Sequence, residues 1–316
     1  MSRRILLVAH PARPEAHFTA LGVARRLQQA NIEIAIDRDL AHTDLADLPG
    51  VIIAEEHEAL RGCELIVVLG GDGTILRGAE LARGTGVPIV GVNLGHVGFL
   101  AEAEREALDS TVERIVARDY VVEERLAVEV VATKDGTELM RSWALNEVSI
   151  EKAARERMLE LALGIDGRPL SSWGCDGLIV ATPTGSTAYA FSAGGPIVWP
   201  HVQAILVVPI SAHALFARPM VIGPDSTVMV QIDPQTEGSA VAWCDGQRAV
   251  DLPPGTRIEV RRSPEPVRFA RLTRAPFTDR LVAKFDLNTR GWRAEARARQ
   301  EREANGTDSG ATPPVA

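Results

Sequence analysis

Short, uninterrupted apolar runs near the N-terminus constrain the fold more than any other feature of this sequence. They occupy residues 5–9, 32–36, 65–69 and 87–92. Runs of this length without polar alternation are typical of strands buried on both faces of a parallel sheet. Helix-like patterns at 14–30 and 102–119 alternate with them. The N-terminal part is therefore predicted to be an α/β domain with an open, mainly parallel sheet covered by helices.

The pattern changes near residue 125, where strand-like runs are separated by tight-turn signals. Asp-Gly pairs stand between such runs at 135–136, 166–167 and 245–246, and the first pair separates the runs at 126–133 and 138–148. Asp-Gly is the favoured signal for a two-residue β-hairpin turn. We therefore expect an α/β domain over 1–125 and a β-rich, largely antiparallel C-terminal domain over 126–271. A helix is expected at 278–284, and the polar residues 294–316 are interpreted as a disordered tail.

Composition narrows the class of function. The 316 residues are 46% hydrophobic and carry a net charge of −8. The chain can bury a core, but an acidic protein is a poor candidate for nonspecific binding to nucleic acid or to a membrane surface. No apolar run approaches the length of a membrane span. The three cysteines lie far apart without a zinc spacing, which favours a cytoplasmic location.

A glycine-rich segment follows the strand expected at 65–69. Residues 70–74 have the sequence GGDGT and lead into a helix-like pattern. Glycines let a phosphate approach main-chain N–H groups, and a helix N-terminus favours anions. The carboxylate of Asp72 repels phosphate, so it suits a general base or a metal ligand better than passive binding. A tight strand-to-helix turn with a solvated aspartate explains the spacing alone equally well.

Two further segments follow predicted strands. Residues 93–100 form a second glycine-rich loop containing His96, at a strand end where open α/β sheets bind ligands. A loop that fixes sheet geometry is a better interpretation of it than a catalytic histidine. Asn146 and Glu147 stand side by side at a strand, where they can hydrogen-bond ribose hydroxyls. Taken alone, the pair is explained more simply by a solvated strand end.

The longest segment that carries chemistry covers residues 174–195. A buried strand pattern leads into TPTGSTAY at 182–189. The amphipathic ring of Tyr189, with the hydroxyls of Thr187 and Ser192 nearby, can stack on a base and hold its polar edges. A serine- and threonine-rich turn that opens a helix is the structural alternative. The segment does not match the nucleophile elbow of serine hydrolases, which argues against that class.

Together and in this order, these segments resemble the NAD kinase family. The resemblance covers about residues 5–292, and TPTGSTAY is its most specific part, since phosphofructokinases and diacylglycerol-type lipid kinases resemble the GGDG piece. It implies an α/β domain rejoined by a returning segment, 272–293, and a β-rich NAD-binding domain, with the active site between them. The implied reaction is phosphoryl transfer to the 2′-hydroxyl of the adenosine ribose of NAD, which gives NADP.

The resemblance also implies a role for each matching residue. Asp72 would be the base that takes the ribose hydroxyl proton, and Gly73 would approach the dinucleotide phosphates. Arg77 and Arg157 match basic positions near the nucleotide phosphates. The remaining matches would contact bound NAD: Asn146, Glu147, Asp176, Thr187, Ala188, Tyr189, Ser192 and Gln247. Gly174 departs from the pattern, because some relatives carry an arginine there.

The expected partners are NAD and either ATP or polyphosphate. Mg²⁺ or another divalent cation is expected to arrive mainly with the nucleotide, because the sequence shows no cage of carboxylates; no metal-ligating residue is assigned. The resemblance implies a homo-oligomer, a dimer or a tetramer. Two alternatives stay open: a diacylglycerol-type or sugar kinase sharing the GGDG loop, and a non-catalytic NAD(P) sensor. Asp72 argues against the sensor, because a pure binding loop gains little from a carboxylate beside phosphates.

Overall fold

The computed structural model describes residues 3–10, 12–54, 60, 62–94, 98–104, 107–154, 158–214, 217–272, 276–289 and 291. The chain divides into two compact units, Met1–Arg274 and Ala275–Ala316. The second unit contains helix α5 (Phe277–Phe285), which confirms the helix expected at 278–284. The tail expected at 294–316 lies outside the described residues.

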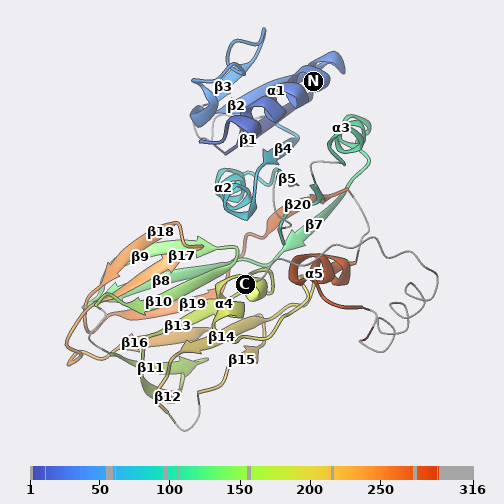
Figure 1. Cartoon of the computed structure of the whole chain (residues 1–316). Helices are drawn as coiled ribbons and strands as arrows, with labels where there is room; N and C mark the ends of the chain where they lie inside the picture. Colours follow the sequence, from blue (N-terminus) through green and yellow to red (C-terminus); the bar gives the residue numbers. More distant parts are fainter. Residues whose placement is uncertain are drawn as a thin grey trace, which may run out of the picture. The chain divides into compact units, whose positions relative to one another are not determined.

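The first unit begins with an eight-stranded sheet in the order β3-β2-β1-β4-β5-β20-β7, in which β6 pairs with β5 (Figure 1). Its strands are β1 (Arg3–Ala9), β2 (Ile32–Asp37), β3 (Ile52–Ala54), β4 (Leu65–Leu69), β5 (Ile89–Asn93), β6 (Ala103–Glu104), β7 (Val121–Arg125) and β20 (Val267–Arg271). Every pairing is parallel except that of β20 with β7. β4 and β5 are buried at every position, as their continuous apolar runs require. The predicted open, mainly parallel sheet is confirmed.

The elements that connect these strands include the helices α1 (Pro14–Gln29), α2 (Asp72–Ala82) and α3 (Leu108–Ala117) and the 3-10 turn η1 (Arg38–Leu40). α1 begins with a proline at its first position, where the missing N–H costs nothing. α3 is shorter than the helix expected at 102–119. Ala103 and Glu104 form β6 beside β5 instead, because their backbone groups extend the sheet. The left-handed Arg118, with a φ of 57°, ends the helix.

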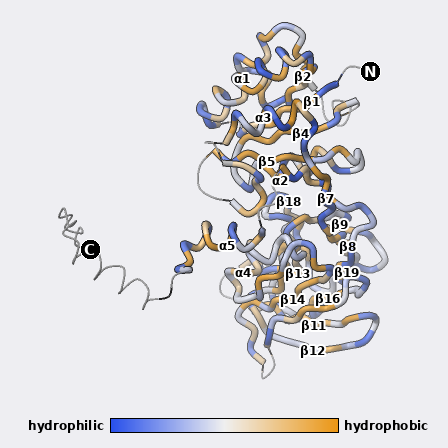
Figure 2. The backbone as a smooth tube through the Cα atoms, turned by 90° about the vertical axis from the view of Figure 1, so that its right-hand side faces the viewer, coloured by the Kyte–Doolittle hydropathy of each residue, from blue (hydrophilic) through white to orange (hydrophobic). Residues whose placement is uncertain are grey.

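The β-rich domain consists of two six-stranded antiparallel sheets, in the orders β15-β14-β13-β10-β17-β18 and β12-β11-β16-β19-β8-β9. Their strands are β8 (Val128–Lys134), β9 (Thr137–Ala144), β10 (Glu147–Lys152), β11 (Leu159–Ile165), β12 (Arg168–Cys175), β13 (Gly177–Ala181), β14 (Ile205–Ile210), β15 (Met220–Ile222), β16 (Val228–Ile232), β17 (Ala240–Cys244), β18 (Arg248–Leu252) and β19 (Arg257–Arg262). Apolar side chains of both sheets form one buried cluster, and Figure 2 shows apolar residues concentrated along the strands.

All three Asp-Gly pairs form the turns that were predicted. They join β8 to β9, β11 to β12 and β17 to β18, and each of these strand pairs is antiparallel. Both residues of every pair have a positive φ, the backbone of the turn type that Asp-Gly favours. The predicted β-rich, largely antiparallel domain is confirmed.

Two expectations about chain path are wrong. β20, placed by sequence in the β-rich domain 126–271, lies in the first sheet between β5 and β7. The pattern of a strand does not reveal which sheet it joins. The run at 138–148 is likewise not one strand, since β9 and β10 belong to different sheets. Asn146 stands at the crossing between them and is buried.

Helix α2 contributes to a buried cluster that both domains share. Its Ile75 and Ala79 belong to the same apolar cluster as Trp143 and Leu145, which stand at the end of β9 and just beyond it. This packing sets the first turn of α2 close to the crossing between the two sheets. No helix among the described residues is long and apolar enough to cross a membrane.

Candidate active site

The GGDGT segment forms the turn from β4 into α2, and Asp72 is the first residue of the helix. Its carboxylate accepts hydrogen bonds from the backbone N–H groups of Phe99, at 3.2 Å, and Leu100, at 3.1 Å. A Cβ added at Gly98 would lie 2.5 Å from Asp72 Oδ1, so only glycine leaves room for this contact. The second glycine-rich loop therefore holds the Asp72 carboxylate. His96, in the same loop, lies outside the described residues.

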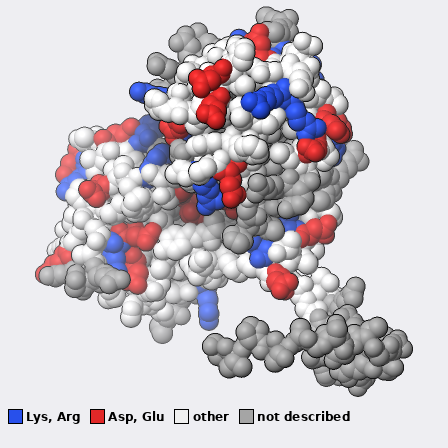
Figure 3. Space-filling model, turned by 45° about the horizontal axis from the view of Figure 1, so that its top comes forward, with Lys and Arg blue, Asp and Glu red and all other residues white. Residues whose placement is uncertain are grey.

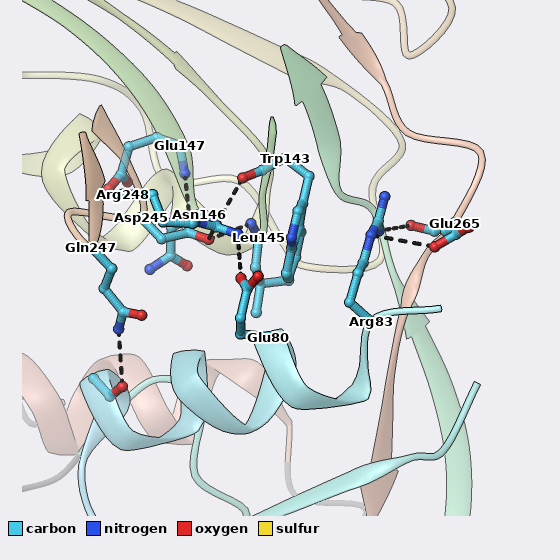
Figure 4. Close-up of polar contacts among 11 residues, drawn as sticks. Glu80, Arg83, Trp143, Leu145, Asn146, Glu147, Asp245, Gln247, Arg248 and Glu265 are labelled. Carbon is cyan, nitrogen blue, oxygen red and sulfur yellow. Dashed lines mark hydrogen bonds and ion pairs between the residues drawn. The ribbon is translucent and has the colours of Figure 1, made fainter. Parts of the chain in front are cut away.

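A hairpin of the β-rich domain reaches the first turn of α2. Gln247, just after the Asp245-Gly246 turn, donates from Nε2 to the backbone oxygen of Gly73 at 3.2 Å (Figure 4). Both residues are exposed, so the contact borders open solvent. The structure thus brings together two predicted site residues that are far apart in the sequence.

Asp245 organises the loop at 145–147 from the same hairpin. Its carboxylate accepts hydrogen bonds from the backbone N–H of Leu145 at 2.9 Å, of Asn146 at 2.7 Å and of Glu147 at 3.3 Å. Burial raises the pKa of Asp245, while these amides and Arg248 act in the opposite direction. Sequence reasoning did not assign Asp245 this role. Its position opposite the Asn-Glu pair follows from strand pairing that no local pattern encodes.

Glu147 is a buried carboxyl group with unused hydrogen-bonding capacity. Burial, and then the neighbouring charge of Asp245, raises its pKa from 4.5 to about 8. The backbone N–H of Tyr189 donates to the side chain and opposes this rise. Oε2 is buried and has no hydrogen-bond partner among the described residues. A buried polar atom of this kind costs free energy unless a ligand satisfies it.

The TPTGSTAY segment follows β13 as the 3-10 turn η4 (Thr184–Thr187) and the short helix α4 (Tyr189–Ser192). Thr182 Oγ1 donates to the backbone oxygen of Leu145 at 2.5 Å. A Cβ added at Gly185 would lie 2.0 Å from the backbone oxygen of Asn146. The segment therefore packs directly on the 145–147 loop. Part of its conspicuous composition serves this packing rather than a ligand.

The remaining predicted contacts within residues 174–195 are exposed or half-buried. Tyr189 is 37% exposed, and its hydroxyl donates to Glu151 Oε2 at 3.3 Å. Ser192 is exposed, and Thr187 and Ala188 are half-buried. Asp176 forms an ion pair with Lys152 at 2.5 Å, and that contact lowers the pKa of the carboxyl group. The Tyr189 ring is thus open on one side, next to the buried Glu147.

Of the two arginines predicted near the nucleotide phosphates, the structure describes Arg77 but not Arg157. Arg77, on α2, pairs with Asp37 at 2.6 Å and with Asp39, both at the carboxyl end of β2. Its charge is therefore shared with two carboxylates, which the sequence did not predict. Arg157 lies outside the described residues. On the face of the molecule that Figure 3 shows, basic side chains are likewise interspersed among acidic ones.

Comparison with known proteins shows which family this chain belongs to. The model of the ATP-NAD kinase N-terminal domain matches residues 5–120, and that of the ATP-NAD kinase C-terminal domain matches residues 145–272. The chain belongs to the NAD kinase family. This confirms the predicted enzyme class and sets aside the lipid-kinase and sugar-kinase alternatives.

Relatives match over nearly their full length. NAD kinase 2 of Streptomyces avermitilis is 54% identical over 92% of this chain and 97% of its own. The NAD kinase of Mycobacterium tuberculosis is 51% identical over 93% of this chain and 99% of its own. A yeast NADH kinase complexed with NADH shares the fold, with a TM-score of 0.83 at 23% identity over 91% of this chain and 88% of its own. An NAD kinase from Archaeoglobus fulgidus in complex with ATP has a TM-score of 0.70 at 26% identity, covering 90% and 100%.

Proposed function

We propose that this enzyme transfers the terminal phosphoryl group of ATP to the 2′-hydroxyl of the adenosine ribose of NAD, forming NADP. The names of the high-identity relatives support the acceptor, and the ATP complex of the Archaeoglobus enzyme supports the donor. One observation in this chain carries the proposal. The Gly73–Gln247 contact joins the helix turn that holds Asp72 to the hairpin whose Asp245 holds the backbone of the 145–147 loop.

The acceptor side is built from the 145–147 loop and α4. The free Oε2 of Glu147 is suited to accept a hydrogen bond from a ribose hydroxyl or an adenine amino group. The open ring of Tyr189 offers a stacking surface to the adenine base. A nucleoside bound there satisfies the buried carboxyl group, and this gain favours NAD over ligands without a ribose hydroxyl.

Asp72 acts as the general base. The 2′-hydroxyl loses its proton to the carboxylate, its oxygen forms the new bond to the γ-phosphorus, and the bond from phosphorus to the leaving ADP oxygen breaks. The amides of Phe99 and Leu100 fix the carboxylate, so it is already oriented when the hydroxyl arrives. Positioned bases of this kind contribute roughly 10²- to 10⁴-fold in rate. Phosphoryl transfer otherwise depends on positioning and charge neutralisation.

Mg²⁺ enters this proposal as part of the donor nucleotide, where it neutralises phosphate charge when bound. The residues that the structure describes contain no group of three or more His, Cys, Asp or Glu side chains that could hold a metal ion. The prediction from the sequence, which assigns no metal-ligating side chain, stays a prediction. The cytoplasmic location and the homo-oligomeric state stay predictions from the sequence.

Product analysis tests the proposal. Purified full-length protein is incubated with NAD and Mg²⁺, in parallel with ATP and with polyphosphate, and NADP is detected with an NADP-specific dehydrogenase. We expect NADP with ATP. If NADP forms only with polyphosphate, the donor assignment is wrong. If neither donor yields NADP although NAD binds in calorimetry, the kinase proposal is wrong and the sensor alternative replaces it.

A further inference from the structure

One face of helix α2 meets the β-rich domain along its whole length. Three residues mark this face: Gly73, Glu80 seven positions later, and Arg83 three positions after that, at the C-terminal end of the helix. Residues at these spacings lie on the same side of an α-helix. Gly73 contacts Gln247, as described above. Glu80 and Arg83 make further polar contacts with the β-rich domain. Both lie well away from Asp72, so the function assigned so far does not use them.

The guanidinium group of Arg248 contacts both helix α2 and the β-rich domain. It forms an ion pair with Glu80 of α2 (Figure 4). Its Nη2 also donates to the backbone oxygen of Trp143 at 2.8 Å and to Asp245 Oδ2 at 3.2 Å. Asp245 holds the amides of the 145–147 loop. A single side chain therefore links the helix that carries the base to the carboxylate that shapes the acceptor loop.

Trp143 lies between this arginine and a second one. The Cζ atoms of Arg83 and Arg248 are 4.6 Å and 4.8 Å from its ring centroid, within cation–π range. The indole is buried, with 7% of its surface exposed. Arg83 also donates to Ser263 Oγ at 2.7 Å and to the backbone oxygen of Glu265 at 2.7 Å. The end of α2 is thus fastened to the β-rich domain by two stacked guanidinium groups and their partners.

Close packing does not fix the end of α2 on every side. A cavity of about 250 Å³ borders it, lined by Ala82, Arg83, Gly86, Glu265, Val267 and Arg268. Empty space beside a helix end lets the helix shift without steric clash. The polar contacts of Glu80 and Arg83 oppose such a shift, together with the apolar packing of Ile75 and Ala79 on the β-rich domain.

We propose that Arg248, Trp143 and Glu80 are positioning residues for phosphoryl transfer, and that they fix α2, and with it Asp72, relative to the 145–147 loop. This inference rests on the proposed function. A misplacement of about 1 Å at a reacting group can cost on the order of 10²-fold in rate. Loss of these contacts therefore slows the transfer step, while each substrate still meets its own binding residues.

Steady-state kinetics of Arg248→Gln, Glu80→Gln and their double variant test the inference. We expect kcat to fall ten- to hundredfold in each single variant, with KM for NAD and for ATP within threefold of wild type. The double variant is expected to be no slower than Arg248→Gln, because both changes break the same link. Trp143→Phe, which keeps an aromatic ring between the two arginines, is expected to stay within threefold of wild type, and Trp143→Leu is expected to lose more.

Arg4→Gln is the matched control. Arg4 pairs with Glu33 at 2.8 Å near the amino end of β1, and its side chain is 29% exposed, compared with 27% for Arg248. The inference is overturned if kcat stays within twofold of wild type in Arg248→Gln, if KM rises at constant kcat, or if Arg4→Gln loses as much activity. If Arg248→Gln does not fold, Glu80→Gln and the two Trp143 variants decide by the same criteria. A wild-type enzyme that makes no NADP overturns the proposed function as well, whereas an active enzyme with unaffected variants overturns only this inference.

Discussion

Replacing Glu147 by glutamine should stabilise the protein, and the gain should grow with pH. The folded state raises the pKa of Glu147 from 4.5 to about 8, chiefly because the carboxyl group is buried and then because Asp245 is near. Between these two values the folded protein keeps a proton that the unfolded chain releases. Stability is therefore lost as pH rises from 4.5 to about 8. Glutamine resembles the protonated carboxyl group but does not titrate, so it removes this loss.

The magnitude follows from the two pKa values. At ~1.36 kcal/mol per pKa unit, the interval from 4.5 to about 8 corresponds to about 5 kcal/mol once the group is ionised. Most assays sample only part of this range. Between pH 6 and pH 8 the free energy of unfolding of the wild type should fall relative to Glu147→Gln by about 2 kcal/mol, the order expected from ~1.36 kcal/mol per pH unit below the folded pKa.

Urea unfolding of both proteins at several pH values between 6 and 8 measures this difference. Glu259→Gln serves as a control, because Glu259 is a half-exposed carboxylate paired with Arg257 on β19. The free energy of unfolding of Glu259→Gln should change with pH as that of the wild type does. A Glu147→Gln advantage that stays constant across the pH range would refute the reasoning, since it would show that Glu147 does not keep its proton in the folded state.

Three further predictions follow from the contacts of the site. Gly98→Ala should lower kcat at least tenfold with little change in melting temperature, because the added Cβ would lie 2.5 Å from Asp72 Oδ1. Steady-state NADP formation measures kcat, and a variant with wild-type kcat would contradict this prediction. Gly185→Ala should destabilise the protein by about 3 kcal/mol or more in urea unfolding, since its Cβ would lie 2.0 Å from the backbone oxygen of Asn146. Gly22→Ala, whose Cβ meets no atom within 4 Å, is the control for both, and an equal effect there would count against them. The three buried cysteines, Cys63, Cys175 and Cys244, should resist alkylation by iodoacetamide at pH 8 until the protein unfolds, because burial raises the pKa of each thiol to about 11. Rapid labelling of the folded protein, detected by mass spectrometry, would disprove this prediction.

Local patterns predicted most of the fold. The run at 65–69 is β4 with the same bounds, because a strand buried on both faces needs an unbroken apolar run. Asp135-Gly136 forms the turn of an antiparallel hairpin, because its backbone preference is set within the two residues. Patterns of this kind do not report tertiary partners. β20 was therefore placed with the wrong sheet.

The site was predictable as a set of segments but not as a geometry. Asp72 stands out in its glycine-rich segment, whereas Glu147 was predicted only through the resemblance to the NAD kinase family. Asp245 and Arg248 were missed, because their importance comes from contacts with residues about one hundred or more positions away. Arg77 was predicted as a basic residue, but its pairing with Asp37 depends on how α2 packs on the sheet, which brings this side chain to the end of β2.

The role of Asp72 as the base is the central claim, and Asp72→Asn tests it most directly. Asparagine keeps one oxygen, which can accept from one of the two amides of Phe99 and Leu100, but its side chain takes no proton from a hydroxyl. NADP formation should be measured in a single turnover with ATP, together with NAD affinity by calorimetry. We expect the rate to fall at least about 100-fold, with NAD affinity within threefold of wild type. A variant that forms NADP at the wild-type rate would show that another group accepts the proton.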